Sequence, residues 1–314
     1  MPYRENSMNS HNRTALRAST LVAGLLIPFY IHAANQAPPP KRPEPQPPAS
    51  QSVQPQVDKR TADAARQKQR ELMAEAQAAI AETERALKAL DDKRTRDALS
   101  ALASATGTLE LILARSPRLA LAPVRTDVLT HDLLARDDTI KAAVKAVRDR
   151  LRDGDVQKAR QLMQSLASEV EFRTLNIPLE TYLDAIKAIT PLIDAGKTEE
   201  AKTALRTMLG TLVVTTEIAP LPKLRAEEQI KAAQALSEKA NRSKEDNLKL
   251  AQSIAAARDP LRIAELLGYG DKKDYKPMYQ QLDELEKKTA GGKSGIGWFD
   301  KIRQQLGAWL NVAA

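Results

Sequence analysis

The sequence predicts an almost entirely α-helical protein: a helical bundle built from duplicated α-hairpins, with extended proline-rich connections. Apolar residues make up 42% of the 314-residue chain, yet only 4% of the residues are aromatic. Cores rich in Ala and Leu suit closely packed helices, whereas sheets favour β-branched and aromatic residues. Apolar residues also recur at steps of three and four, and a helix-turn-helix pattern repeats along the chain.

The N-terminus has the pattern of a secretory signal peptide. A basic stretch precedes an apolar run at 21–31, which is interrupted by Pro28 and is too short to span a bilayer comfortably. Ala33 offers a small residue for cleavage, so we expect residues 1–33 to be a signal peptide that directs the protein to the periplasm. Ile31 is a poor fit at its position before the cleavage point, which leaves an uncleaved N-terminal anchor as the alternative.

A proline-rich segment follows the expected signal peptide. Eight of the chain's 18 prolines lie between residues 38 and 55. Because proline fixes its own backbone angle and lacks a donor, such a stretch favours extended polyproline structure over a helix. Residues 34–57 are therefore predicted to be a disordered spacer.

Helical periodicity begins at about residue 58, and residues 58–290 are predicted to form the all-α domain. The first stripe of apolar residues extends from Leu72 to Leu90, and a second predicted helix covers 96–115. Pro117 and Pro123 then require an extended connection.

An internal repeat is the most informative pattern in this domain. Residues 153–178 align with residues 195–220 at a displacement of 42, and a fainter copy precedes the first by 61 residues. Each copy has the pattern of a helix, a glycine or polar turn, an amphipathic helix and a proline-ended extended segment. Gly154 and Gly196 suit the left-handed position after a helix. The pattern predicts duplicated α-hairpins in a bundle, with a regular solenoid as the alternative.

The residues before the last proline of each copy are harder to assign. The segment 212–220 is rich in β-branched residues and could form a short strand. Its repeat partner, 170–178, resembles the end of a helix. We therefore expect a buried helix C-terminus that passes into extended chain.

Further helices are predicted at 222–240, 244–257, 260–267 and 275–289. Ser243 and Asp246 have the spacing of a capping box at one of these starts. Residues 291–314 are predicted to form a glycine hinge and a C-terminal amphipathic helix.

Composition excludes several classes of function. The formal net charge is +8, but most Lys and Arg residues alternate with Asp and Glu along the helices, so nucleic-acid binding is not expected. Cysteine is absent, which excludes disulfides, thiolate metal sites and lipid attachment at a cysteine. His131 is the only histidine left after export, so no metal site and no cofactor is expected.

No constellation of residues predicts catalysis. His131 and Asp132 could activate a hydroxyl such as that of Ser168, but no nucleophile motif accompanies them. A glycine-rich stretch ends at Lys293, yet it has Lys287 where a phosphate-binding loop requires its first glycine. We expect no catalytic residues and predict that the protein is not an enzyme.

An apolar stripe flanked by Lys301 and Arg303 is the candidate interaction site. Both tryptophans of the chain lie on it, and the pattern suits a membrane interface or a partner's groove. Packing on its own bundle or on a neighbouring subunit is the alternative. The stripe consists of Trp298, Phe299, Ile302, Leu306, Trp309 and Leu310.

Several stretches of the chain resemble bacterial YfdX proteins. The similarity extends over roughly residues 60–305 and leaves out the N-terminal 57. The matching stretches are Ile112–Pro117, Gly154–Arg160, Leu212–Glu217, Pro220–Glu227, Ala264–Gly270 and Lys288–Gly295.

This resemblance implies a helical, periplasmic, homo-oligomeric protein linked to acid, heat or drug stress, of a kind also found in mobile heat-resistance gene clusters. The family has no agreed catalytic residues to carry over. We therefore expect a non-enzymatic stress-protection protein that binds non-native polypeptides or small apolar ligands. The alternative is a membrane-surface scaffold or regulator that docks through the C-terminal helix.

Overall fold

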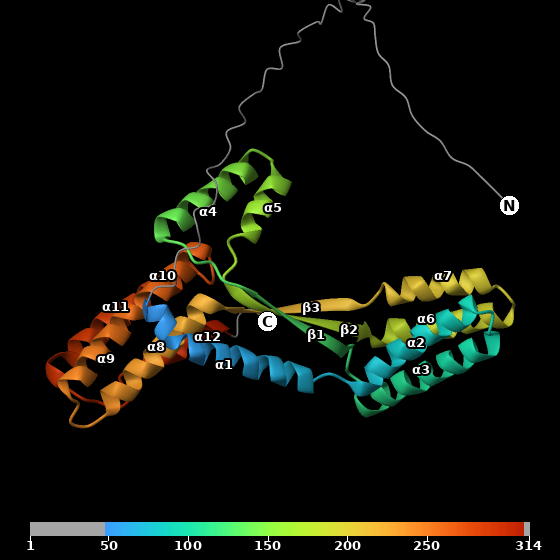
Figure 1. Ribbon diagram of the computed structural model, residues 1–314, viewed down its shortest axis with the longest axis horizontal. Coiled ribbons are helices and arrows are strands. Elements are labelled where there is room, and N and C mark those ends of the chain that lie inside the picture. The colour runs from blue at the N-terminus through green and yellow to red at the C-terminus, as the bar shows by residue number, and fades with distance from the viewer. Residues whose placement is uncertain (1–47, 311–314) are drawn as a thin grey trace, which may run out of the picture. The chain divides into compact units, whose positions relative to one another are not determined.

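A three-stranded antiparallel sheet joins the helices of this protein (Figure 1). The computed structural model describes residues 48–310, all within one compact unit of the chain. Strand β2 (Glu169–Pro178) lies in the middle, with β1 (Leu121–His131) and β3 (Val213–Pro220) at its two edges. The expected signal peptide and the expected spacer up to residue 47 lie outside the described residues.

The described part of the chain is mostly helical, as predicted, with 71% of the described residues in helices. The prediction that it is all-α was wrong, because 170–178 and 212–220 form strands rather than helix ends. Their β-branched residues favour strands, but the deciding interaction is pairing between segments far apart in sequence, such as Thr174 with Thr215. A local sequence pattern does not reveal such pairing.

Four helices form a core at the end of the sheet where β1 starts and β2 ends. They are α2 (Ala74–Asp91), α3 (Thr95–Arg115), α6 (Leu179–Asp194) and α7 (Thr198–Leu209). Helix α3 packs on α6 and helix α2 packs on α7. The centre of this core includes Leu90, Leu102, Leu109, Ile112, Tyr182, Ile186, Ile193 and Leu205.

A separate helix pair lies between β1 and β2 in the chain. Helix α4 (Asp137–Arg152) and helix α5 (Val156–Gln164) are joined by a turn in which Gly154 has a positive φ of 80°. Gly196 has the same conformation between α6 and α7, as predicted. Each strand of the sheet is thus preceded by two helices in the chain.

A second helical core follows β3. It consists of α8 (Leu221–Glu238), α9 (Lys244–Ala256), α10 (Arg258–Leu267), α11 (Lys272–Thr289) and α12 (Asp300–Leu310), with a 3-10 turn at Ala290–Gly292. The predicted capping box is present, because the Ser243 hydroxyl accepts a hydrogen bond of 3.0 Å from the Asp246 backbone.

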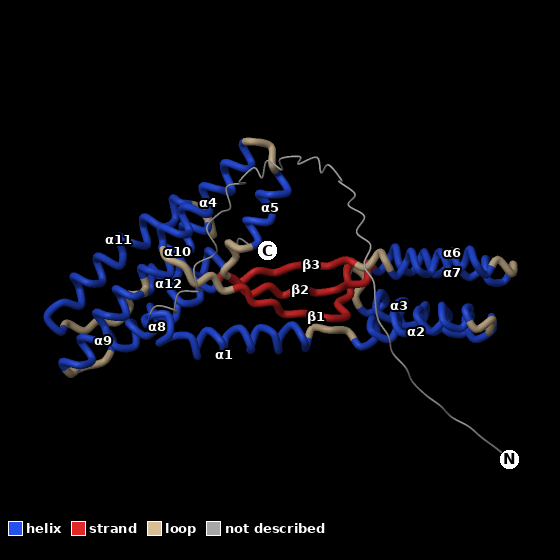
Figure 2. Tube along the Cα trace, turned by 45° about the horizontal axis from the view of Figure 1, so that its top comes forward, coloured by secondary structure: helices blue, strands red, loops and turns tan. Residues whose placement is uncertain are grey.

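Helix α1 (Pro48–Arg70) runs beside the sheet (Figure 2). The expected spacer at 34–57 is therefore helical from residue 48 onward. Pro48 opens the helix, where no backbone donor is needed, and Pro55 is accommodated inside it. Burial compensates for the lost backbone bond, since Val57 packs with Phe172 and Leu224 in a third apolar cluster.

Asn176 is the polar centre of the sheet. Its buried amide nitrogen donates to the Thr174 carbonyl at 2.8 Å, the Val213 carbonyl at 3.2 Å and the Thr215 hydroxyl at 3.1 Å. We predict that Asn176→Ala lowers the free energy of unfolding by about 1–3 kcal/mol, because the hydrogen bonds of a buried side chain are lost. Thr216→Ala, at an exposed position of β3, should change it by at most about 0.5 kcal/mol. Urea denaturation of both variants measures the difference.

Candidate binding site at helix α8

The first turns of helix α8 are buried on all sides. Every residue from Leu221 to Ala226 is buried, although Lys223 and Arg225 are among them. The helix begins directly after β3, and it packs against α1, α9, α10 and α12. Because charged side chains are almost never fully buried without partners, this segment is the most unusual chemical environment among the described residues.

Arg225 is held by two elements. Its guanidinium donates to both Asp132 carboxylate oxygens, at 3.0 and 2.7 Å, and to the Gln54 amide oxygen at 2.9 and 3.1 Å. Asp132 follows β1, whereas Gln54 belongs to α1. The bidentate pair and the amide together join the end of the sheet to the first and eighth helices.

A second polar chain continues from Asp132. The Ser168 hydroxyl donates to Asp132 at 3.4 Å, and the Tyr269 hydroxyl donates to the Glu169 carboxylate at 2.5 Å. The same Tyr269 oxygen accepts the Ser168 backbone N–H at 2.9 Å. His131 lies apart, with its Nε2 3.5 Å from Glu171. Ser168 and Asp132 thus come together, but the histidine faces another carboxylate and no nucleophile–base pair forms.

Lys223 is the buried base of the site. Burial lowers its pKa to about 7, nearby Arg60 acts in the same direction, and Glu227 opposes both. The lysine therefore changes its charge near neutral pH, whereas a solvated lysine does so only near pH 10.

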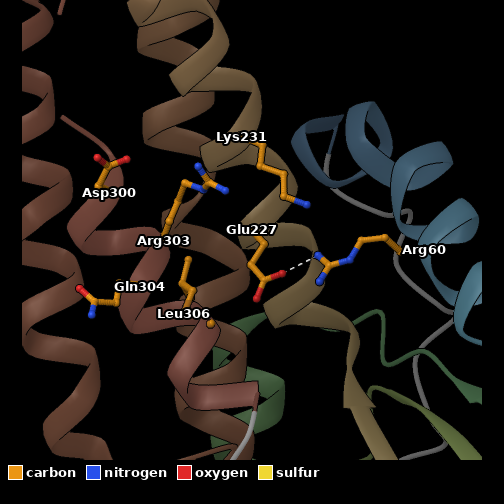
Figure 3. A pocket seen from close by; sticks show the side chains of 8 residues that line it. Arg60, Glu227, Lys231, Asp300, Arg303, Gln304 and Leu306 are labelled. Atoms are coloured by element: carbon orange, nitrogen blue, oxygen red, sulfur yellow. Dashed lines mark hydrogen bonds and ion pairs between the residues drawn. The ribbon is translucent and has the colours of Figure 1, made fainter. Parts of the chain in front are cut away.

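A polar cavity of about 420 Å³ adjoins this segment between α1, α8 and α12 (Figure 3). Arg60 donates to Glu227 at 2.5 Å and to Glu228 at 3.1 Å. Lys231 and Arg303 add two further cations to the lining. The positive and negative groups nearly balance, so the cavity's charge favours neither anions nor cations.

A larger and more apolar groove also lies along α8. It has a volume of about 890 Å³ and is formed by α1, α8 and α9. Its apolar lining comes from Pro48, Val53, Ala232, Leu236, Ala255 and Ala256. Its polar groups are Ser52, Gln56, Glu228, Gln229, Lys231, Lys249, Gln252 and Ser253. This volume is in the range of sites for small organic ligands, and the polar side chains of the lining outnumber the apolar ones.

The predicted C-terminal stripe packs inside its own bundle. Phe299, Ile302 and Leu306 are buried in the second core against residues of α8 and α11, and Trp298 is partly buried against the same cluster. The side chains of Trp309 and Leu310 lie outside the described residues. In this conformation the three buried side chains are not available to a membrane or a partner.

Helix α3 is the described helix that is long and apolar enough to cross a membrane, with a hydropathy of 1.2. Core helices of soluble proteins meet the same criterion, and α3 packs on α2 and α6. Among the described residues, no group of three or more acidic, cysteine or histidine side chains is placed to hold a metal ion.

Sequence reasoning did not find the groove or the buried charges of α8. A signal was present, because the stretch from Leu221 to Ala226 places Lys223 and Arg225 among apolar residues without a clear polar face. A helix without a polar face is a helix buried all round. The partners of those charges, Gln54 and Asp132, are far away in sequence and could not be predicted from it.

The comparison with protein families matches residues 79–218 to the family described as YfdX protein. Residues 79–218 carry the YfdX family pattern. The match extends from α2 to β3 and leaves out α1 and α8–α12, so the groove and Lys223 lie outside it. The resemblance inferred for residues 60–305 is thereby shown for its central part.

A solved structure of Salmonella Typhi YfdX is similar to 48% of this chain and 93% of its own, with 16% identity and a TM-score of 0.33. No curated protein matches the chain.

We predict that Lys223 makes the stability of the protein depend on pH above neutrality. The folded pKa is about 7 and the ordinary value is 10.5, so between these values the unfolded chain binds more protons than the folded chain. The free energy of unfolding should therefore rise by about 2 kcal/mol between pH 7 and pH 9 through this residue.

Lys223→Met should remove this rise, and Lys301→Met, at an exposed position, should leave it unchanged. Guanidinium denaturation at the two pH values measures the effect. Equal pH dependence in wild type and Lys223→Met would show that Lys223 keeps its ordinary pKa.

Asp132→Ala should lower the free energy of unfolding by about 3 kcal/mol, because it leaves the guanidinium of Arg225 buried without its carboxylate. Asp138→Ala, at the exposed start of α4, should cost less than about 1 kcal/mol. Thermal unfolding followed by circular dichroism compares the two. Similar costs for both would mean that water replaces Asp132 at the guanidinium.

Proposed function

We propose that this protein is a non-enzymatic stress-protection protein of the periplasm whose groove beside α8 binds small apolar ligands or apolar side chains of non-native polypeptides. The observation that carries the proposal is the 890 Å³ groove between α1, α8 and α9. Its apolar floor removes hydrocarbon surface from water, at about 25 cal/mol per Å². Its amide and hydroxyl groups orient the polar end of a ligand.

The YfdX family pattern of residues 79–218 supports a role in stress protection, because that is what the family resemblance implies. The pattern of residues 1–33 supports export to the periplasm. The resemblance also supports a homo-oligomer. The membrane-surface alternative is not favoured, since three of the six stripe residues it relied on are buried.

The chain's architecture supports duplication of an α-hairpin followed by an extended segment. The element order helix, helix, strand occurs three times, as α2–α3–β1, α4–α5–β2 and α6–α7–β3. The displacement of 42 residues relates the second and third units in sequence. We take these three units as copies of one ancestral unit, with α8–α12 as a separate addition.

Filling the groove tests the proposed function. Ala232 lines the groove from an exposed position on α8, so Ala232→Trp should block it without disturbing the core. We predict that the variant binds an apolar fluorescent dye at least tenfold more weakly than wild type, as measured by titration. It should also be less able to suppress aggregation of a heated client protein.

Ala235→Trp is the matched control, because Ala235 is exposed on the same helix but does not line the groove. It should bind dye and client as wild type does. Loss of dye binding alone would assign the groove to small ligands and polypeptide binding to another surface. Full activity of Ala232→Trp in both assays would overturn the proposal.

A further inference from the structure

A cavity of about 420 Å³ lies where helix α10 packs on helix α4, at the start of α11 (Figure 1). It shares no lining residue with the groove beside α8 or with the cavity of Figure 3. Among the described residues of its lining, Glu265 is the one acid. Four cationic side chains face this single carboxylate in the lining: Lys141, Arg148, Arg262 and Lys272.

Most of this positive charge has no acidic partner. Arg262 donates to Asp137 and to Glu265, each at 3.2 Å, so its charge is matched twice. The side chains of the other three cations have no ion pair or hydrogen bond to another described residue. With Asp137 counted, the groups around the cavity therefore keep two positive charges more than negative ones. Because like charges repel one another, an anion in the cavity would stabilise this arrangement.

The two cations on α4 depart from the internal repeat. Lys141, Val144 and Arg148 follow one another at steps of three and four, so they lie on one face of the helix. At the displacement of 42 residues, Leu183 and Thr190 of α6 take the places of the two cations. The face of α6 that carries Leu183 belongs to the first core, where α6 packs on α3. In α4, charged groups therefore occupy positions that serve helix packing in the other copy.

Two helix ends meet at the cavity, and their effects on an anion are opposite. Lys272 is the first residue of α11, and the partial positive charge at this N-terminus favours an anion. The preceding Asp271 makes no side-chain cap and pairs instead with Lys273 at 3.1 Å. The C-terminus of α10 disfavours an anion, but the backbone N–H groups of Gly268 and Tyr269 already bond to carbonyls of its last turn. The side-chain cations therefore decide the sign of the ligand.

We propose that this cavity binds a phosphomonoester, that is, a phosphate group carried on a small organic body. Such a group carries about two negative charges at pH 7, which matches the excess of positive charge around the cavity. The guanidinium of Arg148 suits phosphate oxygens because it donates two parallel hydrogen bonds, and Lys141 and Lys272 add charge on either side.

The rest of the lining suits the organic body of the ligand. The cavity is larger than a phosphate group requires, and it has an apolar part that a bare ion would leave unused. This part consists of Val144, Leu266 and Leu267. A phosphate group with a small ring or a short hydrocarbon chain therefore fits better than inorganic phosphate.

Calorimetric titration of the full chain with phenyl phosphate tests the proposal. We expect Arg148→Gln to raise the dissociation constant by about tenfold or more, because a charged hydrogen-bond donor is lost. Lys272→Gln, on α11, should weaken binding as well. Arg150→Gln and Lys276→Gln are the matched controls, since they remove exposed cations from the same two helices without touching the cavity. All four positions are exposed, so each variant should fold as wild type does.

Two related ligands test the charge of the bound group. Benzoate carries one negative charge on the same ring and phenol carries none at pH 7, so both should bind about tenfold more weakly than phenyl phosphate, or weaker still. Benzoate binding as tightly as phenyl phosphate would overturn the assignment of a dianion. Equal losses in Arg148→Gln and Arg150→Gln would reveal a diffuse attraction to basic surface and would overturn the site.

A phosphomonoester can be a soluble compound or the headgroup of a lipid. Flotation with phosphatidylcholine vesicles that contain phosphatidic acid separates these sources. Binding of phenyl phosphate without flotation supports a soluble ligand, and flotation that Arg148→Gln abolishes supports a lipid headgroup. No binding in the titration, together with no flotation or with flotation that Arg148→Gln leaves unchanged, would overturn the proposal. The groove is tested separately, because Ala232→Trp does not touch this cavity and should bind phenyl phosphate as wild type does.

Discussion

The bidentate contact between Arg225 and Asp132 is the interaction on which the arrangement of elements around the sheet depends. It joins the end of β1 to the start of α8, and Gln54 adds α1 to the same guanidinium. The sheet has only three strands and cannot bury itself. Fixing α1 and α8 beside it lets Phe172 and Val170 become a core.

Burial of this ion pair also removes water from the neighbouring side chains of α8. Once the first turns of α8 are surrounded, Lys223 loses its solvation along with Arg225, and its pKa falls towards neutrality. Further along the same helix one face becomes exposed, and α8 forms the groove there together with α1 and α9. The buried charges and the groove therefore both follow from where α8 starts.

Local sequence patterns predicted the features that depend only on residues close together in the sequence. The approximate bounds of α3 and of α8–α11, the Ser243 capping box and the left-handed glycines at 154 and 196 were predicted, since each is decided within a few residues. The sheet was missed because Thr174 finds Thr215 only through tertiary pairing. The stripe from Phe299 to Leu306 was recognised as apolar. Periodicity shows that a helix has an apolar face, but it does not show whether that face packs against the protein's own bundle or against another surface.

The core formed by α2, α3, α6 and α7 has a consequence for the order of folding. Its two halves are separated in sequence by strand β1, the α4–α5 hairpin and strand β2. A chain that is synthesised or exported from its N-terminus presents Leu102, Leu109 and Ile112 before α6 and α7 have followed. Local helix contacts form in microseconds, whereas closing this loop must wait for the rest of the chain. During that interval the first hairpin is the segment most exposed to premature association.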